Sequence, residues 1–380
     1  MKMKLTHLIV PSALAIASAT GTLAQEAANL PPCDNCSDTL TISSWGGAYQ
    51  DMQQKLFADP YMAATGIRII WEESSGEAVA KLRAMTEAGK ISWDLADVLA
   101  SDGIRLCDEG LAQEVPFDEW LAPAPDGTPA SEDLAKNITS DCLVPTNAYS
   151  TAFAYRTDVA EWNGAVPTSI CDVFDLEKFP GKRALEKRPV NNLEWALICS
   201  GVPADQVYDT LATDEGVQTA LDKLGSIKSQ TVWWSAGAET PQLLADKEVV
   251  IGSGYNGRLF SLIAEQKQPA AMLWDYEVLD LDGFVVPEGI SEDHLNRAKH
   301  FLNFATTTQN LADITKYISY GPTRESSQPL VGNHAELGID MKPHMPTAPE
   351  NAKTGFLFNY AWWADHRDDL DTRFQAWLAQ

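Results

Sequence analysis

The sequence predicts an α/β protein with two lobes, and three observations lead to this prediction. The chain has 380 residues, of which 45% are hydrophobic, and at about 100 to 200 residues per domain this length corresponds to two globular domains. From residue 38 onward, short β-like runs alternate with helical stretches, which is typical of a mostly parallel sheet. The same alternation returns after a long extended segment, so we expect the chain to enter each lobe twice.

In the first lobe, each short β-like run is followed by a helix. The expected strands are 39–43, 67–72 and 94–99, and the expected helices are 49–57, 77–88 and 103–109. Ligands of parallel sheets bind beyond the carboxyl ends of the strands. We therefore expect the loops at 44–49, 73–77 and 100–103 to share one rim.

The rest of the chain supplies a second lobe and a return to the first. Residues 121–131, rich in Pro, Gly and Asp, predict an exposed insertion, and residues 144–155 predict an extended crossover. Further strands are expected at 181–185, 249–253 and 283–286, and further helices at 193–199, 216–227 and 257–265. The resulting division is an arm at 25–37, lobe 1 at 38–145 plus 284–325, and lobe 2 at 146–283 plus 326–380.

The first residues indicate export. Lys2 and Lys4 precede an apolar stretch at 8–17, and small residues at Thr22 and Ala24 resemble a secretory signal peptide, 1–24, cleaved after Ala24. The apolar stretch is too short to cross a bilayer, which needs about 20 residues. No Cys directly follows the cleavage signal, so we expect a freely exported periplasmic protein.

The charge balance narrows the class of partner. The chain carries 53 acidic against 28 basic residues, a formal net charge of −25. Such a surface repels nucleic acid and anionic membranes and favours cationic or neutral small partners. We expect a monomer that needs no cofactor.

Six cysteines lie beyond the signal peptide. An even number in an exported chain favours disulfides. Nearness in sequence suggests Cys33 with Cys36, Cys107 with Cys142, and Cys171 with Cys199. A zinc site or a redox pair at Cys33 and Cys36 is the alternative.

Several short motifs occur in a characteristic order. Residues 40–49 read Leu-Thr-Ile-Ser-Ser-Trp-Gly-Gly-Ala-Tyr, followed by Asp-Glu-Gly at 108–110, Phe-Pro-Gly-Lys at 179–182, Gly-Tyr-Asn-Gly at 254–257, Asp-Leu-Asp at 280–282 and Tyr-Gly-Pro-Thr at 320–323. Together they resemble the periplasmic solute-binding proteins of ABC importers, specifically the spermidine/putrescine-binding branch. The resemblance covers about residues 38–380. It implies a type II periplasmic-binding-protein fold, with a hinge of two or three crossing strands and a membrane permease and ATPase as partners.

The resemblance also implies a binding site for an amine. An ammonium group is held by a carboxylate and aromatic faces, at about 0.5 to 2 kcal/mol per ring. The loop that follows Trp233 is a further candidate for the cleft. The expected ligand-binding residues are Ser44, Trp45, Tyr49, Ser101, Asp102, Trp234, Tyr255, Asp280, Asp282 and Tyr320.

The sequence departs from the polyamine-binding pattern at one position, and this departure changes the expected charge of the solute. Basic Arg188 stands where polyamine binders carry acidic residues. A guanidinium in the cleft would repel a second ammonium and bind a carboxylate. This favours a zwitterionic solute over a long diamine, whereas a solvated surface position for Arg188 is the alternative.

Other functions receive less support. The six His show no His-Glu-x-x-His spacing, and Gly252-Ser253-Gly254 lacks the spacing of a nucleophile elbow, so a secreted hydrolase is disfavoured. The same fold could bind an opine, an amino-acid derivative or a ferric ion, or present its ligand to a chemoreceptor. The adjacent Tyr pair typical of ferric sites is missing from the sequence.

Overall fold

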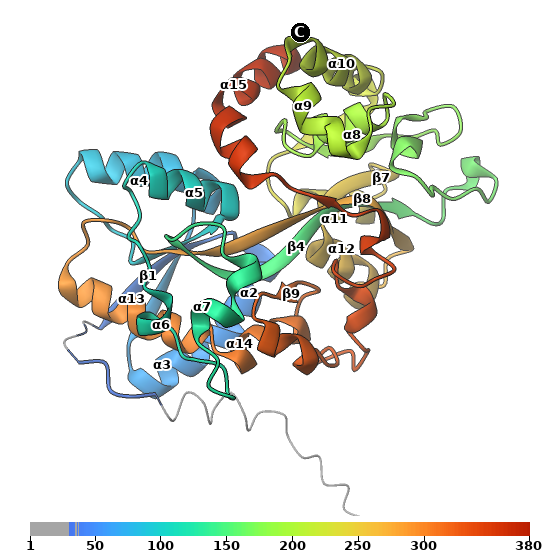
Figure 1. Ribbon diagram of the computed structural model, residues 1–380. Helices are drawn as coiled ribbons and strands as arrows, with labels where there is room; N and C mark the ends of the chain where they lie inside the picture. The colour runs from blue at the N-terminus through green and yellow to red at the C-terminus, as the bar shows by residue number, and fades with distance from the viewer. Residues whose placement is uncertain (1–29, 35, 37) are drawn as a thin grey trace, which may run out of the picture.

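A computed structural model describes residues 30–34, 36 and 38–380, and it shows two groups of helices joined by long central strands (Figure 1). The signal peptide and residues 25–29 of the arm lie outside the described residues. Ten strands form one mixed sheet in the order β2-β1-β3-β8-β4-β7-β5-β6, with β10 on β8 and β9 on β4. The strands are β1 (Thr39–Ser44), β2 (Arg68–Glu73), β3 (Leu95–Leu99), β4 (Leu143–Arg156), β5 (Arg183–Glu186), β6 (Thr231–Trp234), β7 (Ile251–Tyr255), β8 (Ala270–Val285), β9 (Gly321–Pro322) and β10 (Phe356–Leu357).

Most helices cover the two ends of this sheet. They are α2 (Gly47–Gln53), α3 (Asp59–Thr65), α4 (Ala78–Glu87), α5 (Ala100–Asp108), α6 (Phe117–Trp120), α7 (Ala130–Asp133), α8 (Asn192–Ile198), α9 (Val207–Leu211), α10 (Asp214–Gly225), α11 (Glu239–Ala245), α12 (Asn256–Phe260), α13 (Glu292–Ala305), α14 (Thr308–Asp313) and α15 (Tyr360–Leu378). We call the half with β1, β2 and β3 lobe 1, and the half with β5, β6 and β7 lobe 2.

Two long antiparallel strands connect the lobes. β4 has 14 residues and β8 has 16, and they pair along most of their length. β8 also pairs with β3 in lobe 1, and β4 pairs with β7 in lobe 2. Both strands therefore run from one lobe into the other, as Figure 1 shows at the centre of the molecule. The predicted α/β fold with a hinge of crossing strands is confirmed.

Each lobe has its own hydrophobic core. Ile42, Phe57 and Phe301 are buried in the lobe 1 core, and Trp195 and Trp363 are buried in that of lobe 2. Trp363 comes from α15, so the last helix packs on lobe 2 although it also contacts α5 of lobe 1. Apolar burial of this kind contributes about 25 cal/mol per Å², and separate cores allow each lobe to move as a unit.

The structure differs from the sequence prediction at three places, and the first difference is one of bounds only. The helix expected at 49–57 continues through a π-turn at Gln54–Ala58 into α3, because Pro60 occupies the first turn of α3, where its missing N–H is tolerated. α5 starts directly after β3 at Ala100, so the expected loop at 100–103 is helical. The insertion at 121–131 packs on the molecule, since Leu121 and Ala124 are buried.

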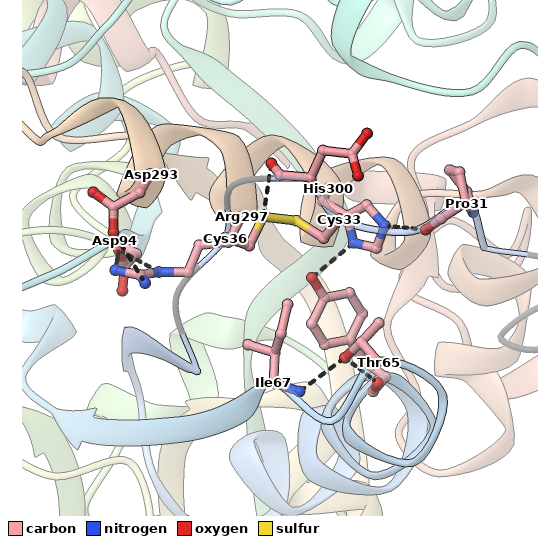
Figure 2. The surroundings of a disulfide bond; sticks show 11 residues. Pro31, Cys33, Cys36, Thr65, Ile67, Asp94, Asp293, Arg297 and His300 are labelled. Atoms are coloured by element: carbon pink, nitrogen blue, oxygen red, sulfur yellow. Dashed lines mark hydrogen bonds and ion pairs between the residues drawn. A yellow bond between two sulfur atoms is a disulfide. The ribbon is translucent and has the colours of Figure 1, made fainter.

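The cysteine pairs suggested by nearness are confirmed, and all six cysteines are bonded as Cys33–Cys36, Cys107–Cys142 and Cys171–Cys199. The sulfur–sulfur bond between Cys33 and Cys36 replaces the alternative of a zinc site there. Figure 2 shows this disulfide next to α13, where Nε2 of His300 donates a hydrogen bond to the carbonyl oxygen of Pro31 at 2.8 Å. The N-terminal arm is thereby held on lobe 1.

Over the described part of the chain, every helix is too short or too polar to cross a bilayer.

Candidate functional site

A narrow pocket lies between the two lobes, beside the crossing strands. Its walls come from the loop after β1, the start of α2, the ends of β3 and β7, both hinge strands, α12 and the segment before β9. Eight residues line it: Trp45, Tyr49, Leu99, Tyr149, Tyr255, Arg258, Asp282 and Tyr320.

Four tyrosines form an aromatic cage in this pocket. The ring of Tyr320 lies 5.9 Å from that of Tyr49 and 5.7 Å from that of Tyr149. Tyr149 and Tyr255 meet edge to face at 5.6 Å. Burial raises the pKa of each of these hydroxyls above its ordinary value, so the cage is neutral at physiological pH. Such π-faces attract a cation placed between them.

One wall of the pocket is acidic. Asp282 lies on β8 and is only 6% exposed, and its Oδ1 has no hydrogen-bond partner among the described residues. Burial, followed by the negative charges of Asp97 and Asp280, raises the pKa of Asp282 well above its usual range, and Arg258 opposes this shift. An uncompensated buried carboxylate of this kind favours the arrival of a cation.

Asp97 on β3 lies behind the pocket wall and holds its side chains in place by hydrogen bonds. Its carboxylate accepts hydrogen bonds from Trp45 Nε1 at 3.2 Å, from the Tyr49 hydroxyl at 2.8 Å and from Gln53 Nε2 at 2.6 Å. Asn147 Nδ2 donates in turn to the Tyr49 hydroxyl at 2.8 Å. Two pocket-lining aromatic side chains are thus fixed by one buried acid. Burial raises the pKa of Asp97 to about 7 despite these donors.

Arg258 on α12 supplies the positive charge of the pocket. It is 8% exposed, and its Nη2 donates to the carbonyl oxygens of Trp45 at 3.3 Å and Gly46 at 3.4 Å, across the gap between the lobes. Its Nε is buried without a hydrogen-bond partner among the described residues. Gly46 has φ of 66° and Gly47 has φ of 57°, a conformation that glycine adopts readily. This backbone turns the two carbonyls toward the guanidinium.

A wider, more polar cleft of about 920 Å³ adjoins the pocket and shares Trp45, Tyr255 and Arg258 with it. Arg188 lines this cleft. Its Nε donates to Glu186 Oε1 at 2.7 Å, and its Nη2 donates to the Tyr255 hydroxyl at 3.2 Å. Arg188 therefore faces the cleft, with part of its charge balanced by Glu186.

The structure brings five of the predicted site residues into the pocket and two more into the adjoining cleft. Ser44 and Arg188 line only the cleft, and Ser44 Oγ donates to Gln53 Oε1 at 2.5 Å. The five in the pocket are Trp45, Tyr49, Tyr255, Asp282 and Tyr320.

Four predicted residues line neither space. Ser101 and Asp102 point to α15, where Arg367 donates to Ser101 Oγ at 3.0 Å and lies 3.4 Å from Asp102 Oδ1, because α5 starts too early to leave a loop. Trp234 is fully buried behind Tyr255, with ring centroids 5.8 Å apart.

Asp280 is the fourth of these residues. It accepts hydrogen bonds from the Tyr149 hydroxyl at 2.9 Å and from the Leu281 N–H at 2.7 Å. Both of its oxygens are therefore bonded to the protein.

Four residues of the site were not predicted: Asp97, Leu99, Tyr149 and Arg258. Asp97 had a signal in the sequence, since a lone acid inside an apolar strand is costly unless it has partners. Tyr149 lies inside the extended segment that was expected to cross between the lobes. Arg258 directly follows the Gly-Tyr-Asn-Gly motif and had no signal of its own.

Within residues 30–34, 36 and 38–380, His, Cys, Asp and Glu form no group of three or more that could hold an ion. The acids of the pocket face tyrosines and an arginine instead.

Two lobes on a hinge of strands, with a charged aromatic pocket between them, define a binding protein for a small solute. The chain belongs to the bacterial extracellular solute-binding protein family, whose model matches residues 57–347.

Comparison with individual proteins agrees with this class. The chain is 35% identical over 347 residues to a gamma-aminobutyric acid-binding protein of Pseudomonas aeruginosa, covering 90% of this chain and 92% of that protein. The structure is similar to MotA from A. tumefaciens B6 in complex with glucopine, at a TM-score of 0.78 and 27% identity, covering 90% of this chain and 99% of that one. It is also similar to the Atu4243 GABA receptor, at a TM-score of 0.74 and 29% identity, covering 90% of this chain and 98% of that one.

The expected spermidine/putrescine branch receives weaker support. A spermidine/putrescine-binding protein of Streptococcus pneumoniae is 16% identical at a TM-score of 0.61, which shows a common fold alone. The comparisons therefore support the general class of solute-binding protein and not the polyamine branch.

Proposed function

We propose that this protein binds a short zwitterionic amino acid, with γ-aminobutyrate (GABA) as the first candidate, and delivers it from the periplasm to an ABC permease and ATPase complex. The resemblance to ABC-importer proteins and the family membership support the transport role. The division into lobe 1 at 38–145 plus 284–325 and lobe 2 at 146–283 plus 326–380 belongs to the same proposal.

One observation carries the choice of solute. Asp282 Oδ1 and Arg258 Nε are both buried without a hydrogen-bond partner among the described residues, and both side chains line one pocket. A buried polar atom left without a partner costs about 1 to 3 kcal/mol, and more when it is charged. A solute with an ammonium group at one end and a carboxylate at the other would satisfy both atoms at once.

The cage between these charges suits the ammonium end. Tyr49 and Tyr320 line the pocket together with Asp282. Cation–π attraction then adds to the charge-assisted hydrogen bond. A diamine would place its second ammonium next to Arg258, where like charges repel.

The names of similar proteins support the same chemistry. The relative at 35% identity is a gamma-aminobutyric acid-binding protein, and a second similar structure is a GABA receptor. GABA carries the two opposite charges that the pocket matches.

A thermal-shift panel tests the proposal on the purified mature protein. Ligand at 100 times its dissociation constant adds about 2.7 kcal/mol of stability, a shift of several degrees. We expect GABA to raise the melting temperature and spermidine and putrescine to leave it unchanged. A shift with the polyamines alone would contradict the zwitterion proposal.

A second candidate solute follows from the adjoining cleft of about 920 Å³. An amino acid conjugated to a polar tail, as in an opine, could place its tail there beside Arg188. The complex of MotA with glucopine supports this possibility. Arg188→Ala should weaken a tailed solute and leave GABA binding unchanged, whereas equal losses for both would count against a separate subsite.

A further inference from the structure

Asp97 and Asp282 lie on the same face of the sheet as neighbours. Leu99 of β3 is paired with Asp282 of β8, and Asp97 is paired with Phe284. Side chains of paired residues share a face, and so do residues two apart along a strand. Asp97 and Asp282 are therefore diagonal neighbours at about 7 to 8 Å between backbones, within reach of each other's charge. Asp280, two residues before Asp282, lies on this face as well.

The charged groups around Asp97 and Asp282 supply too little positive charge to balance two carboxylates. Asp102 is matched by Arg367 at 3.4 Å. Arg258 is then the cation that faces Asp282, and its Nη2 already donates to two backbone carbonyls. The other titratable groups that face the acids are neutral tyrosines: Tyr49, Tyr149, Tyr320 and Tyr360.

Asp97 and Asp282 differ in the number of hydrogen bonds that they accept, which affects how easily each one ionises. Asp97 has three side-chain donors, which stabilise its ionised form. Asp282 Oδ1 has no partner among the described residues. Two buried carboxylates this close do not both ionise readily, because each charge disfavours the other.

We propose that Asp97 is a specificity-determining residue of the site. Together with Asp282 it forms an acid pair that carries one proton when no solute is bound. The pair releases this proton when the cationic group of the solute binds. This inference rests on the proposed function of the pocket. When an ammonium group enters, the carboxylic acid of the pair gives its proton to the buffer and becomes a carboxylate. The ammonium keeps all of its own protons. A neutral solute cannot replace the lost positive charge, so the pair selects for cations.

Isothermal titration with GABA at neutral pH, in two buffers of different ionisation enthalpy, tests the exchange. The difference in heat gives the number of protons released. We expect at least about half a proton per GABA bound, falling toward zero at high pH, where the pair is already ionised. GABA binding without proton release would overturn the inference and leave the proposed function standing.

Two variants separate the pair from other buried acids. Asp97→Asn should reduce the release at a given pH, because it removes the charge of Asp97 that adds to burial in raising the pKa of Asp282. Glu194→Gln is the matched control. Glu194 is also fully buried, and burial raises its pKa to about 7, but it lies on α8 and accepts hydrogen bonds from Trp363 and Tyr208. Release in Asp97→Asn that is as large as in the wild type across the pH range, or release that disappears in Glu194→Gln, would contradict the assignment.

An infrared measurement decides the question without any solute. Other buried acids, Glu194 and Glu277, also contribute carboxylic-acid bands at neutral pH, so the pair is measured by difference. The spectrum of the unliganded wild type minus that of Asp282→Asn should show a carboxylic-acid carbonyl component, which should be weaker in Asp97→Asn and unchanged in Glu194→Gln. Failure of GABA to bind would count against the proposed function, and this band would still decide the protonation of the pair. The absence of this component from the difference between the wild type and Asp282→Asn would overturn the inference.

Discussion

Replacement of Asp282 by Asn should move affinity and stability in opposite directions. The substitution keeps the shape of the side chain and removes its charge. Removing one partner of a buried ion pair costs about 3 to 5 kcal/mol, and each 1.4 kcal/mol is a factor of about ten in affinity. We therefore expect binding of the zwitterionic solute to weaken more than about 100-fold.

The unliganded variant should be at least as stable as the wild type. The pKa of Asp282 is raised in the folded protein by burial and by Asp97 and Asp280. A folded state that binds its proton more tightly than the unfolded state loses stability as pH rises from the unfolded pKa toward the folded one. At neutral pH the carboxylate of the unfolded chain must take up a proton when Asp282 is buried, which opposes folding, and an amide removes that cost.

Isothermal titration and thermal unfolding of the same preparation test both effects. Asp280→Asn is the matched control, since Asp280 lies on the same strand and face but is bonded to the Tyr149 hydroxyl and the Leu281 N–H. The control should retain most of the affinity. Binding by Asp282→Asn within about threefold of wild type would refute the reasoning, and so would a loss of binding accompanied by an equal loss of folded stability.

Four further predictions concern other parts of the molecule. Arg258→Gln should weaken the binding of GABA more than about tenfold and that of butylamine much less, because the guanidinium binds the carboxylate end of GABA. Competition binding measures the two losses of affinity, and equal losses would exclude that role. The denatured, non-reduced protein should contain no free thiol, since all six cysteines are paired; titration with a thiol reagent that finds two or more would contradict the pairing. The stability of the unliganded protein should fall as pH rises from about 4 to about 8. The cause is burial, which raises the pKa of Asp280 to about 6, of Asp97 and Glu194 to about 7 and of Glu277 to about 8. Chemical denaturation across this range measures whether the free energy of unfolding falls or rises with pH. Small-angle scattering should show a smaller radius of gyration with saturating solute, since a two-lobed binder closes by hinge motion; an unchanged radius would argue against closure.

The sequence predicted the fold better than the site. Alternating strands and helices are local patterns, so the two-lobed α/β architecture followed from them. Tyr255, Asp282 and Tyr320 were found because they stand in recognisable motifs. Arg258 reaches the pocket only because α12 of lobe 2 lies against the loop after β1, and that long-range contact leaves no periodic trace.

Two errors at the site have a local origin. The sequence predicts a helix that starts at Gly103, which leaves Ser101 and Asp102 in a loop. In the structure, α5 begins at Ala100, and the first turn carries both side chains toward Arg367. A shift of three residues in one helix start was enough to move two candidates out of the site.

The most direct test of the central claim is isothermal titration of the wild-type protein with four small molecules that differ only in their charged ends. GABA carries both charges, butylamine only the cation, butyrate only the anion, and putrescine two cations. If Asp282 and Arg258 act at opposite ends of one pocket, GABA should bind at least about 100-fold more tightly than each of the other three. Putrescine or butylamine binding as tightly as GABA would contradict the claim, because the carboxylate would then have no partner in the site.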